Sequence, residues 1–241
     1  MPAGRAAEPT AAIAAAADLQ FALPEIAEAF ERASGHRLRL SFGSSGVFSQ
    51  QIIQGAPFEL FFSADESYVD KVFAAGRSAD RGKLYATGRI ALFIPNGSPI
   101  KADSDLADLG RAALDGRLKH LAIANPEHAP YGRAAREALN HAGIWAQVEK
   151  KLVQGENAAQ AAQFVATGNA QAGILPLSLA RVPAMVAKGA FITLPESWHA
   201  PLRQRMVLLK GAGAAARAFY AYLQQPEARA TLARYGFATA Q

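Results

Sequence analysis

Apolar residues along this chain recur first at the spacing of a strand and then at the spacing of a helix. Residues 37–42 alternate polar and apolar side chains, as a half-buried strand does, and residues 47–53 resume with apolar positions three and four apart. Upstream, residues 9–17 predict a short buried strand of alanine and isoleucine. The helix behind it has one apolar stripe made of Leu19, Leu23, Ile26, Ala27 and Phe30.

The same order returns further along the chain. Strands are predicted at 58–64, 121–124, 151–153, 172–176 and 204–209, and helices at 133–140, 159–167, 214–223 and 228–235. Asp65 stands where it could cap the helix after the strand that ends near residue 64. Repeated strand and helix alternation predicts an α/β protein with largely parallel sheets.

One strand departs from this alternation. Residues 89–95 form a long apolar run with no helix directly before it, and such a strand could cross from one lobe to another. We therefore expect two α/β lobes joined by crossing strands. The predicted boundaries are 9–87 with 203–241 for a discontinuous lobe I, and 88–202 for lobe II.

The sequence SFGSSG at 41–46 ends a strand and opens a helix with small and hydroxyl residues. The backbone amides of Ser44, Ser45 and Gly46 should then lie unpaired at a helix N-terminus, where unpaired amides and the helix dipole favour an anion. The alternative is that Ser44 or Ser45 only caps its helix.

Three other strand-to-helix junctions resemble this one. Asp18 follows the first strand, residues 125–132 follow another, and Gly155 to Ala158 follow a third. Ligands of open α/β sheets bind beyond the carboxyl ends of the strands. Four such junctions in one chain make convergence on a single small anion plausible.

Composition narrows the function. With 241 residues, 51% hydrophobic and 19% charged, the chain is an ordinary globular protein. The net charge of +5 comes from dispersed lysines and arginines, so we expect no nucleic-acid partner, although a mild positive field attracts small anions. Cysteine is absent, which excludes disulfides and thiolate sites.

No segment has the length of a membrane-spanning helix, and we expect no stable membrane insertion. Residues 1–10 contain no apolar core of a signal peptide. The expectation is a mature exported domain whose signal has been removed and whose initiator methionine is new, unless a signal never existed.

Motifs for catalysis are missing. Residues 211–216 mimic a dinucleotide fingerprint, but only helix follows, without the required strand and acidic residue. The five histidines show no metal-ligand spacing, and no G-x-S-x-G elbow occurs. We therefore expect no enzyme activity, no cofactor and no metal-cation site.

Several strings resemble one family, the periplasmic molybdate-binding proteins of ABC importers. The resemblance runs from about 11 to 237 and is most specific in GAPFELFFSAD at 55–65 and NPEHAPYG at 125–132. AAADL at 15–19, SFGSSG at 41–46, GENAAQAAQFV at 155–165 and RYGF at 234–237 add to it.

This resemblance implies a type II periplasmic-binding fold. A tetrahedral oxyanion would lie in the cleft between the lobes, held by hydroxyls and backbone amides without counter-charges. Matched positions assign ligand binding to the amide and side chain of Asp18, the amide and hydroxyl of Ser45, and the amides of Tyr131 and Ala158. The adjacent Ser44 and Asn157 complete the candidate ligand-binding set.

Two positions depart from the family. Pro176 stands where some members have a ligand-binding tyrosine, and it offers neither hydroxyl nor amide. Asp18 stands where serine or asparagine is common. An ionised carboxylate about 4 Å from a dianion would be repelled by several kcal/mol. Asp18 must therefore cap its own helix, be protonated, or accept a hydrogen bond from a ligand that carries a proton.

We therefore expect a monomeric periplasmic solute-binding protein that captures molybdate or tungstate for the permease of an ABC importer. The alternative within this class is a divergent member whose ligand, a protonated oxyanion or a small organic molecule, is selected by Asp18. A two-domain α/β transferase or a cytoplasmic ligand-sensing domain shares the fold class and is the alternative of a different class.

Overall fold

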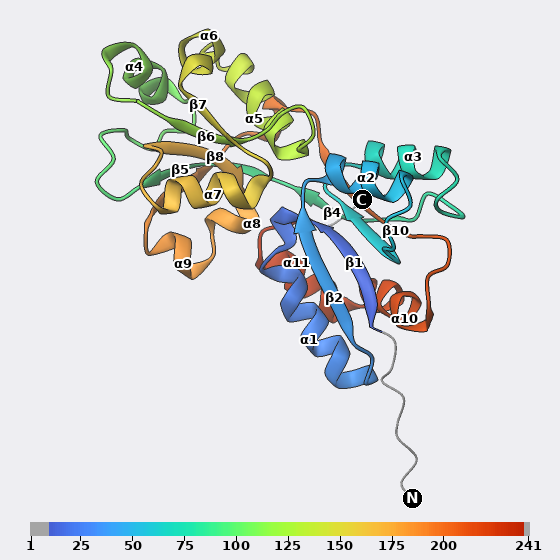
Figure 1. The fold of residues 1–241 in the computed structure, drawn as a ribbon. Helices are drawn as coiled ribbons and strands as arrows, with labels where there is room; N and C mark the ends of the chain where they lie inside the picture. Colours follow the sequence, from blue (N-terminus) through green and yellow to red (C-terminus); the bar gives the residue numbers. More distant parts are fainter. Residues whose placement is uncertain (1–9, 239–241) are drawn as a thin grey trace, which may run out of the picture.

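A computed structural model describes residues 10–238 and contains two lobes, each built on a five-stranded sheet with helices on its faces (Figure 1). The type II two-lobed α/β fold is thus confirmed. Within residues 10–238, no helix combines the length and the apolar character that a membrane span requires.

Lobe I is the part of the chain around the sheet of order β2-β1-β3-β10-β4. β1 is parallel to β2 and β3, whereas β10 is antiparallel to both of its neighbours, β3 and β4. The strands are β1 (Ala11–Ala16), β2 (Leu38–Gly43), β3 (Leu60–Ser63), β4 (Lys83–Gly88) and β10 (Leu202–Leu208).

Lobe II is the part around the sheet of order β7-β6-β8-β5-β9. β6 is parallel to β7 and β8, and β5 is antiparallel to β8 and β9. The strands are β5 (Ile90–Pro95), β6 (Leu121–Ala124), β7 (Leu152–Gly155), β8 (Ala172–Pro176) and β9 (Gly189–Thr193). The sequence pattern did not indicate β9.

Helices cover both sheets. Those of lobe I are α1 (Ala22–Ser34), α2 (Ser45–Ile53), α3 (Glu66–Ala74), α10 (Ala214–Tyr222) and α11 (Pro226–Arg234). Those of lobe II are α4 (Ala107–Asp115), α5 (Pro130–His141), α6 (Trp145–Val148), α7 (Ala158–Ala166), α8 (Leu177–Ala180) and α9 (Pro183–Val186). Short 3₁₀ turns lie at η1 (Ala17–Leu19), η2 (Glu149–Lys151) and η3 (Glu196–Trp198).

The chain passes between the sheets twice. Arg89 alone separates β4 of lobe I from β5 of lobe II, so the long run at 89–95 does leave one sheet for the other. Residues 194–201 return the chain from β9 to β10. We propose that these two passages are the hinge; the expected lobe boundaries at 87/88 and 202/203 lie one residue inside the ends of β4 and β10 that adjoin them.

The core of lobe I follows the predicted pattern. All six residues of β1 are buried, because this strand lies between β2 and β3 and is covered by helices on both sides. The apolar stripe of α1 is buried as predicted, and the helix ends at Gly35, whose φ of 76° suits glycine. The closing helices α10 and α11 pack beside α1 (Figure 1).

Candidate functional site

All six candidate ligand-binding residues line one cavity between the lobes. It encloses about 210 Å³, counting its opening to solvent. Its walls are Ala16, Ala17, Asp18, Gly43, Ser44, Ser45, Ala64, Ala129, Pro130, Tyr131, Asn157 and Ala158, with no lysine, arginine or histidine among them.

Three helices begin at this cavity and leave amides free. Ser45 and Ala158 are the first residues of α2 and α7, and Tyr131 is the second residue of α5, directly after Pro130. Within residues 10–238 their three backbone N–H groups have no hydrogen-bond partner. The positive ends of three helix dipoles therefore face a cavity whose lining carries no basic side chain.

Local sequence explains why these amides stay free. Pro130 has no N–H, so the first amide that α5 offers belongs to Tyr131. Asn157 does cap α7, but its side-chain oxygen accepts from the second and third residues, Ala159 and Gln160, at 3.0 and 3.1 Å. Asn157 thereby leaves the Ala158 amide without a partner. The Asn157 side-chain oxygen itself is engaged in the two capping hydrogen bonds.

The hydroxyls of Ser44 and Ser45 have different tasks. The Ser45 oxygen accepts a hydrogen bond from the Ala64 amide at 3.0 Å, which leaves the Ser45 hydroxyl hydrogen free to donate. The Ser44 hydroxyl instead donates to the His128 carbonyl at 2.5 Å, and its oxygen lies 2.9 Å from His128 Nδ1. Ser44 therefore ties the lobes together, and its side chain makes no capping bond to α2.

The expectation of open amides fails at Gly46. Its N–H donates to the His128 carbonyl of lobe II at 3.0 Å. A side chain at this position would collide with that same oxygen, because an added Cβ would lie 2.6 Å from it. Gly46 thus provides close contact between the lobes rather than an anion-binding amide.

Asp18 does not cap its helix, which corrects one of its three sequence-based interpretations. It lies in the turn η1, and α1 begins only at Ala22, with Phe21 as its N-cap and no side-chain cap. The Asp18 side chain is buried instead. Its Oδ2 accepts hydrogen bonds from the Tyr131 hydroxyl at 2.9 Å and from Gln204 Nε2 at 2.6 Å, while Oδ1 has no partner in the described part of the chain.

Gln204 and Tyr85, which the sequence pattern did not indicate as site residues, complete this buried network. Gln204 also donates to the Tyr131 oxygen at 2.9 Å and accepts from the Tyr85 hydroxyl at 2.6 Å. The pairing of β10 with β4 shifts between Gln204 and Arg205 and leaves Tyr85 opposite no residue, as in a β-bulge. One signal was present: Gln204 alternates with Leu202 and Met206 on the inner face of its strand.

Burial dominates the electrostatics of the network. It raises the pKa of Asp18 to about 6, against the lowering effect of the hydrogen bonds from Gln204 and Tyr131. Burial, with the charge of Asp18, also raises the pKa values of Tyr85 and Tyr131 well above their usual range, so both phenols remain neutral donors. Only Asp18 among the cavity-lining residues changes charge near neutral pH.

Further contacts join the lobes beside the cavity. Ser178 of α8 donates to the Asp18 carbonyl at 2.8 Å, and Arg133 of α5 forms an ion pair with Asp65 of lobe I. Asp65 also caps α3 as predicted, by accepting from the Ser67 amide. Although burial raises its pKa, the Arg133 and Ser67 hydrogen bonds hold the pKa of Asp65 below its usual value. The lobes are therefore closed on each other.

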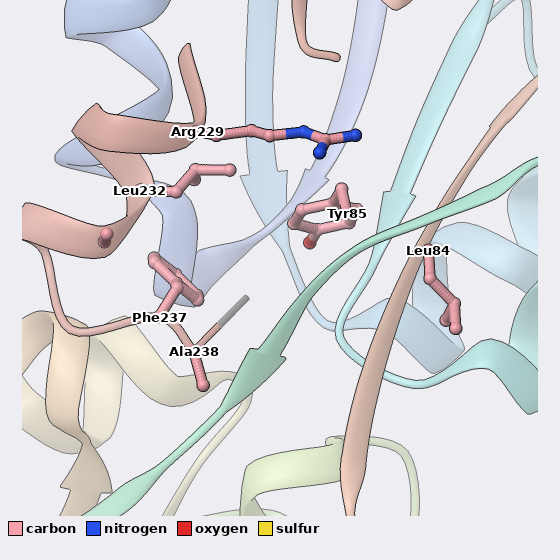
Figure 2. A pocket seen from close by; sticks show the side chains of 7 residues that line it. Leu84, Tyr85, Arg229, Leu232, Phe237 and Ala238 are labelled. Carbon is pink, nitrogen blue, oxygen red and sulfur yellow. The ribbon is translucent and has the colours of Figure 1, made fainter. Parts of the chain in front are cut away.

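A second cavity lies within lobe I, between β4 and α11, and spans about 380 Å³ when its opening to solvent is counted. Figure 2 shows its lining residues, including the Tyr85 ring and the Arg229 side chain. It contains none of the six predicted residues and touches a single lobe. The Tyr85 hydroxyl bonds to Gln204, so this residue belongs to both the pocket wall and the buried network.

No group of three or more histidine, cysteine, aspartate or glutamate side chains within residues 10–238 could hold a metal ion. Pro176 ends β8 and is absent from the lining of the cavity between the lobes. The polar groups available there are thus backbone amides, the Ser45 hydroxyl, the Asn157 side-chain NH₂ group and the Asp18 carboxyl group, which donates only when protonated.

Comparisons with known proteins agree with this geometry. The family model described as "Bacterial extracellular solute-binding protein" matches residues 11–238. The molybdate-binding protein ModA of Azotobacter vinelandii is 37% identical over 228 residues, covering 93% of this chain and 88% of the relative. ModA of Rhodobacter capsulatus is 38% identical over 231 residues, with 94% and 87% covered.

Solved structures share the whole fold. The periplasmic molybdate-binding protein of Azotobacter vinelandii superposes with a TM-score of 0.85 and 28% identity, covering 96% of this chain and all of the other. The sulfate-binding protein SubI of Mycobacterium tuberculosis superposes with a TM-score of 0.81 at 15% identity, which shows the fold alone. The chain therefore belongs to the bacterial extracellular solute-binding proteins, a family of binding proteins that serve transport.

Proposed function

We propose that this protein binds a single tetrahedral oxyanion, molybdate or tungstate, between its lobes and delivers it to the permease of an ABC importer. The observation that carries the proposal is the meeting of three free helix amides, from Ser45, Tyr131 and Ala158, at one small cavity. Fixed backbone donors and helix dipoles stabilise an anion without a counter-charge. The names of the relatives support molybdate as the first ligand to test.

The same residues argue against a larger ligand. Four interlobe contacts, those of Ser44, Gly46, Arg133 and Ser178, close around the cavity. A protein of this kind works on the outer side of the cytoplasmic membrane. We therefore place it in the periplasm, as a monomer.

Calorimetric titration of the ligand-free protein with sodium molybdate, tungstate, sulfate and phosphate tests this function. We expect a single site that prefers molybdate and tungstate. Ligand at one hundred times its Kd should stabilise the protein by about 2.7 kcal/mol, which corresponds to a Tm rise of about 5 to 10 °C.

Native mass spectrometry of the purified protein is the second test of this function. A co-purifying mass equal to one molybdate or tungstate would agree with the proposal. Absence of heat and of any Tm change with all four anions, together with a co-purifying organic mass, would favour the divergent binding protein instead.

A further inference from the structure

Asp18 Oδ1 has no hydrogen-bond partner among the described residues. Unlike the backbone amides at the cavity, this oxygen can take up a proton. We propose that the site binds its oxyanion together with one proton, shared between Asp18 Oδ1 and a ligand oxygen. This inference rests on the proposed function and adds that ligand uptake is coupled to proton uptake.

The hydrogen-bond geometry fixes where that proton resides. Gln204 Nε2 can only donate, and it bonds to Asp18 Oδ2 at 2.6 Å. Its second hydrogen goes to the Tyr131 oxygen, so the Tyr131 hydroxyl hydrogen is the one that points to Oδ2, at 2.9 Å. Oδ2 is thus already the acceptor of two donors, and a proton on the carboxyl group belongs on Oδ1.

A protonated Oδ1 needs an acceptor, and the described residues provide none. Asp18 lines the cavity in which the anion is proposed to bind. An ionised carboxylate there would repel the anion, whereas a carboxylic acid would donate a hydrogen bond to it. Ligand and proton therefore favour each other's binding.

The surroundings of Asp18 add no competing charge. The elements around it present Tyr131 from α5, Tyr85 from β4, Gln204 from β10 and Ser178 from α8, and the two phenols are neutral. β2 and α7 contribute the uncharged residues Gly43 and Ala158 to the lining of the cavity. Asp65 and Arg133, two charged side chains at the contact between the lobes, pair with each other, and no charged side chain contributes to the shift in the Asp18 pKa. The raised pKa of Asp18, about 6, agrees with a group that takes up its proton near neutral pH.

Calorimetry in buffers of different ionisation enthalpy measures the coupling directly. At pH 8 the dependence of the molybdate binding heat on buffer enthalpy should give about one proton taken up per ligand. Above the pKa of Asp18 in the ligand-free protein, the affinity for molybdate should fall by about tenfold for each pH unit. At pH 5 the uptake should be well below one proton, because Asp18 already carries its proton.

Asp18→Asn is the isosteric test. The asparagine oxygen can accept from Tyr131 and Gln204 while its NH₂ group donates where Oδ1–H would, so this variant should bind molybdate without proton uptake and with little pH dependence. Asp70→Asn, at a partly exposed carboxyl paired with Arg81 in lobe I, is the matched control and should behave as the unchanged protein. A urea unfolding curve checks that each variant is folded.

The outcomes separate the two proposals. Tight molybdate binding with no proton uptake at pH 8, or uptake that survives in Asp18→Asn, would overturn the shared proton and leave the oxyanion function in place. Absence of binding by molybdate and tungstate at both pH 5 and pH 8 would overturn the proposed function itself.

Discussion

The hydroxyl of Tyr131 donates a hydrogen bond to Asp18 Oδ2 at 2.9 Å, joining lobe II to lobe I across 113 positions of sequence. The amide of the same tyrosine is one of the three free donors at the cavity. We therefore propose that Tyr131 links ligand binding, through its amide, to lobe closure, through its hydroxyl.

Tyr131→Phe separates these two tasks, because it keeps the amide and removes the hydroxyl. The closed form then loses its bond to Asp18 and an acceptor for Gln204, which should disfavour closure by about 1 to 2 kcal/mol. We expect molybdate affinity to fall about five- to thirty-fold by calorimetry. Tyr85→Phe breaks a bond within lobe I and should lower stability while leaving affinity nearly unchanged; equal affinity losses in both variants would contradict this assignment.

Gly46→Ala should keep the lobes apart. The added Cβ would lie 2.6 Å from the His128 carbonyl oxygen, and backbone cannot yield as a flexible side chain does. Alanine is the better helix former by about 1 kcal/mol, so α2 itself should remain stable. We expect at least a tenfold loss of affinity and a larger radius of gyration with ligand present, by small-angle scattering.

Ser44→Ala removes the neighbouring hydroxyl contacts to His128 without adding bulk, and it is the control for that experiment. Its effect on affinity should be clearly smaller. If both variants closed normally on molybdate, contact between α2 and the loop before α5 would not be needed for closure.

Ser45→Ala should weaken oxyanion binding by about 1 to 3 kcal/mol, the usual cost of losing a hydrogen bond to a charged group. Ser49→Ala is a matched control: it removes a buried hydroxyl from the same helix, where Ser49 donates to the Tyr68 carbonyl away from the cavity. An unchanged Kd for Ser45→Ala in calorimetry would mean that Ser45 acts on the ligand only through its amide.

Asp18→Asn should stabilise the ligand-free protein in a pH-dependent way. Folding raises the Asp18 pKa from 3.8 to about 6, so the free-energy cost of ionising Asp18 in the folded protein develops between about pH 4 and pH 6 and is complete above pH 6. The variant should be more stable by about 3 kcal/mol at pH 8 and by less than about 1 kcal/mol at pH 4. Urea unfolding at both pH values measures this difference, and an equal advantage at both would show that the Asp18 pKa is not raised.

Much of this arrangement was predictable from local pattern. Strand and helix periods placed Ser45, Tyr131 and Ala158 at the starts of three helices, and all three line the cavity. Such junctions depend on residues close in sequence, such as the proline before Tyr131. Their roles as ligand donors stay a prediction.

The polar network was not predictable in the same way. Gln204 meets Asp18 only because β10 inserts between β3 and β4, 186 positions away in sequence. Asp18 resembles a helix cap in sequence, but the turn η1 delays the helix to Ala22 and turns the carboxyl group inward. Gly46 lies in a sequence typical of an anion-binding loop, but its amide donates a hydrogen bond to a carbonyl oxygen of the other lobe.

The position of β10 also determines the order in which the sheets can form during synthesis. β4 pairs with no strand of the described chain other than β10, which follows every strand of lobe II. A nascent chain that ends before residue 202 can complete the lobe II sheet but leaves the facing edges of β3 and β4 unpaired. Lobe I thus becomes a finished folding unit only when almost the whole polypeptide is available: β1, β2 and β3 can pair with one another earlier, but β4 must wait for β10.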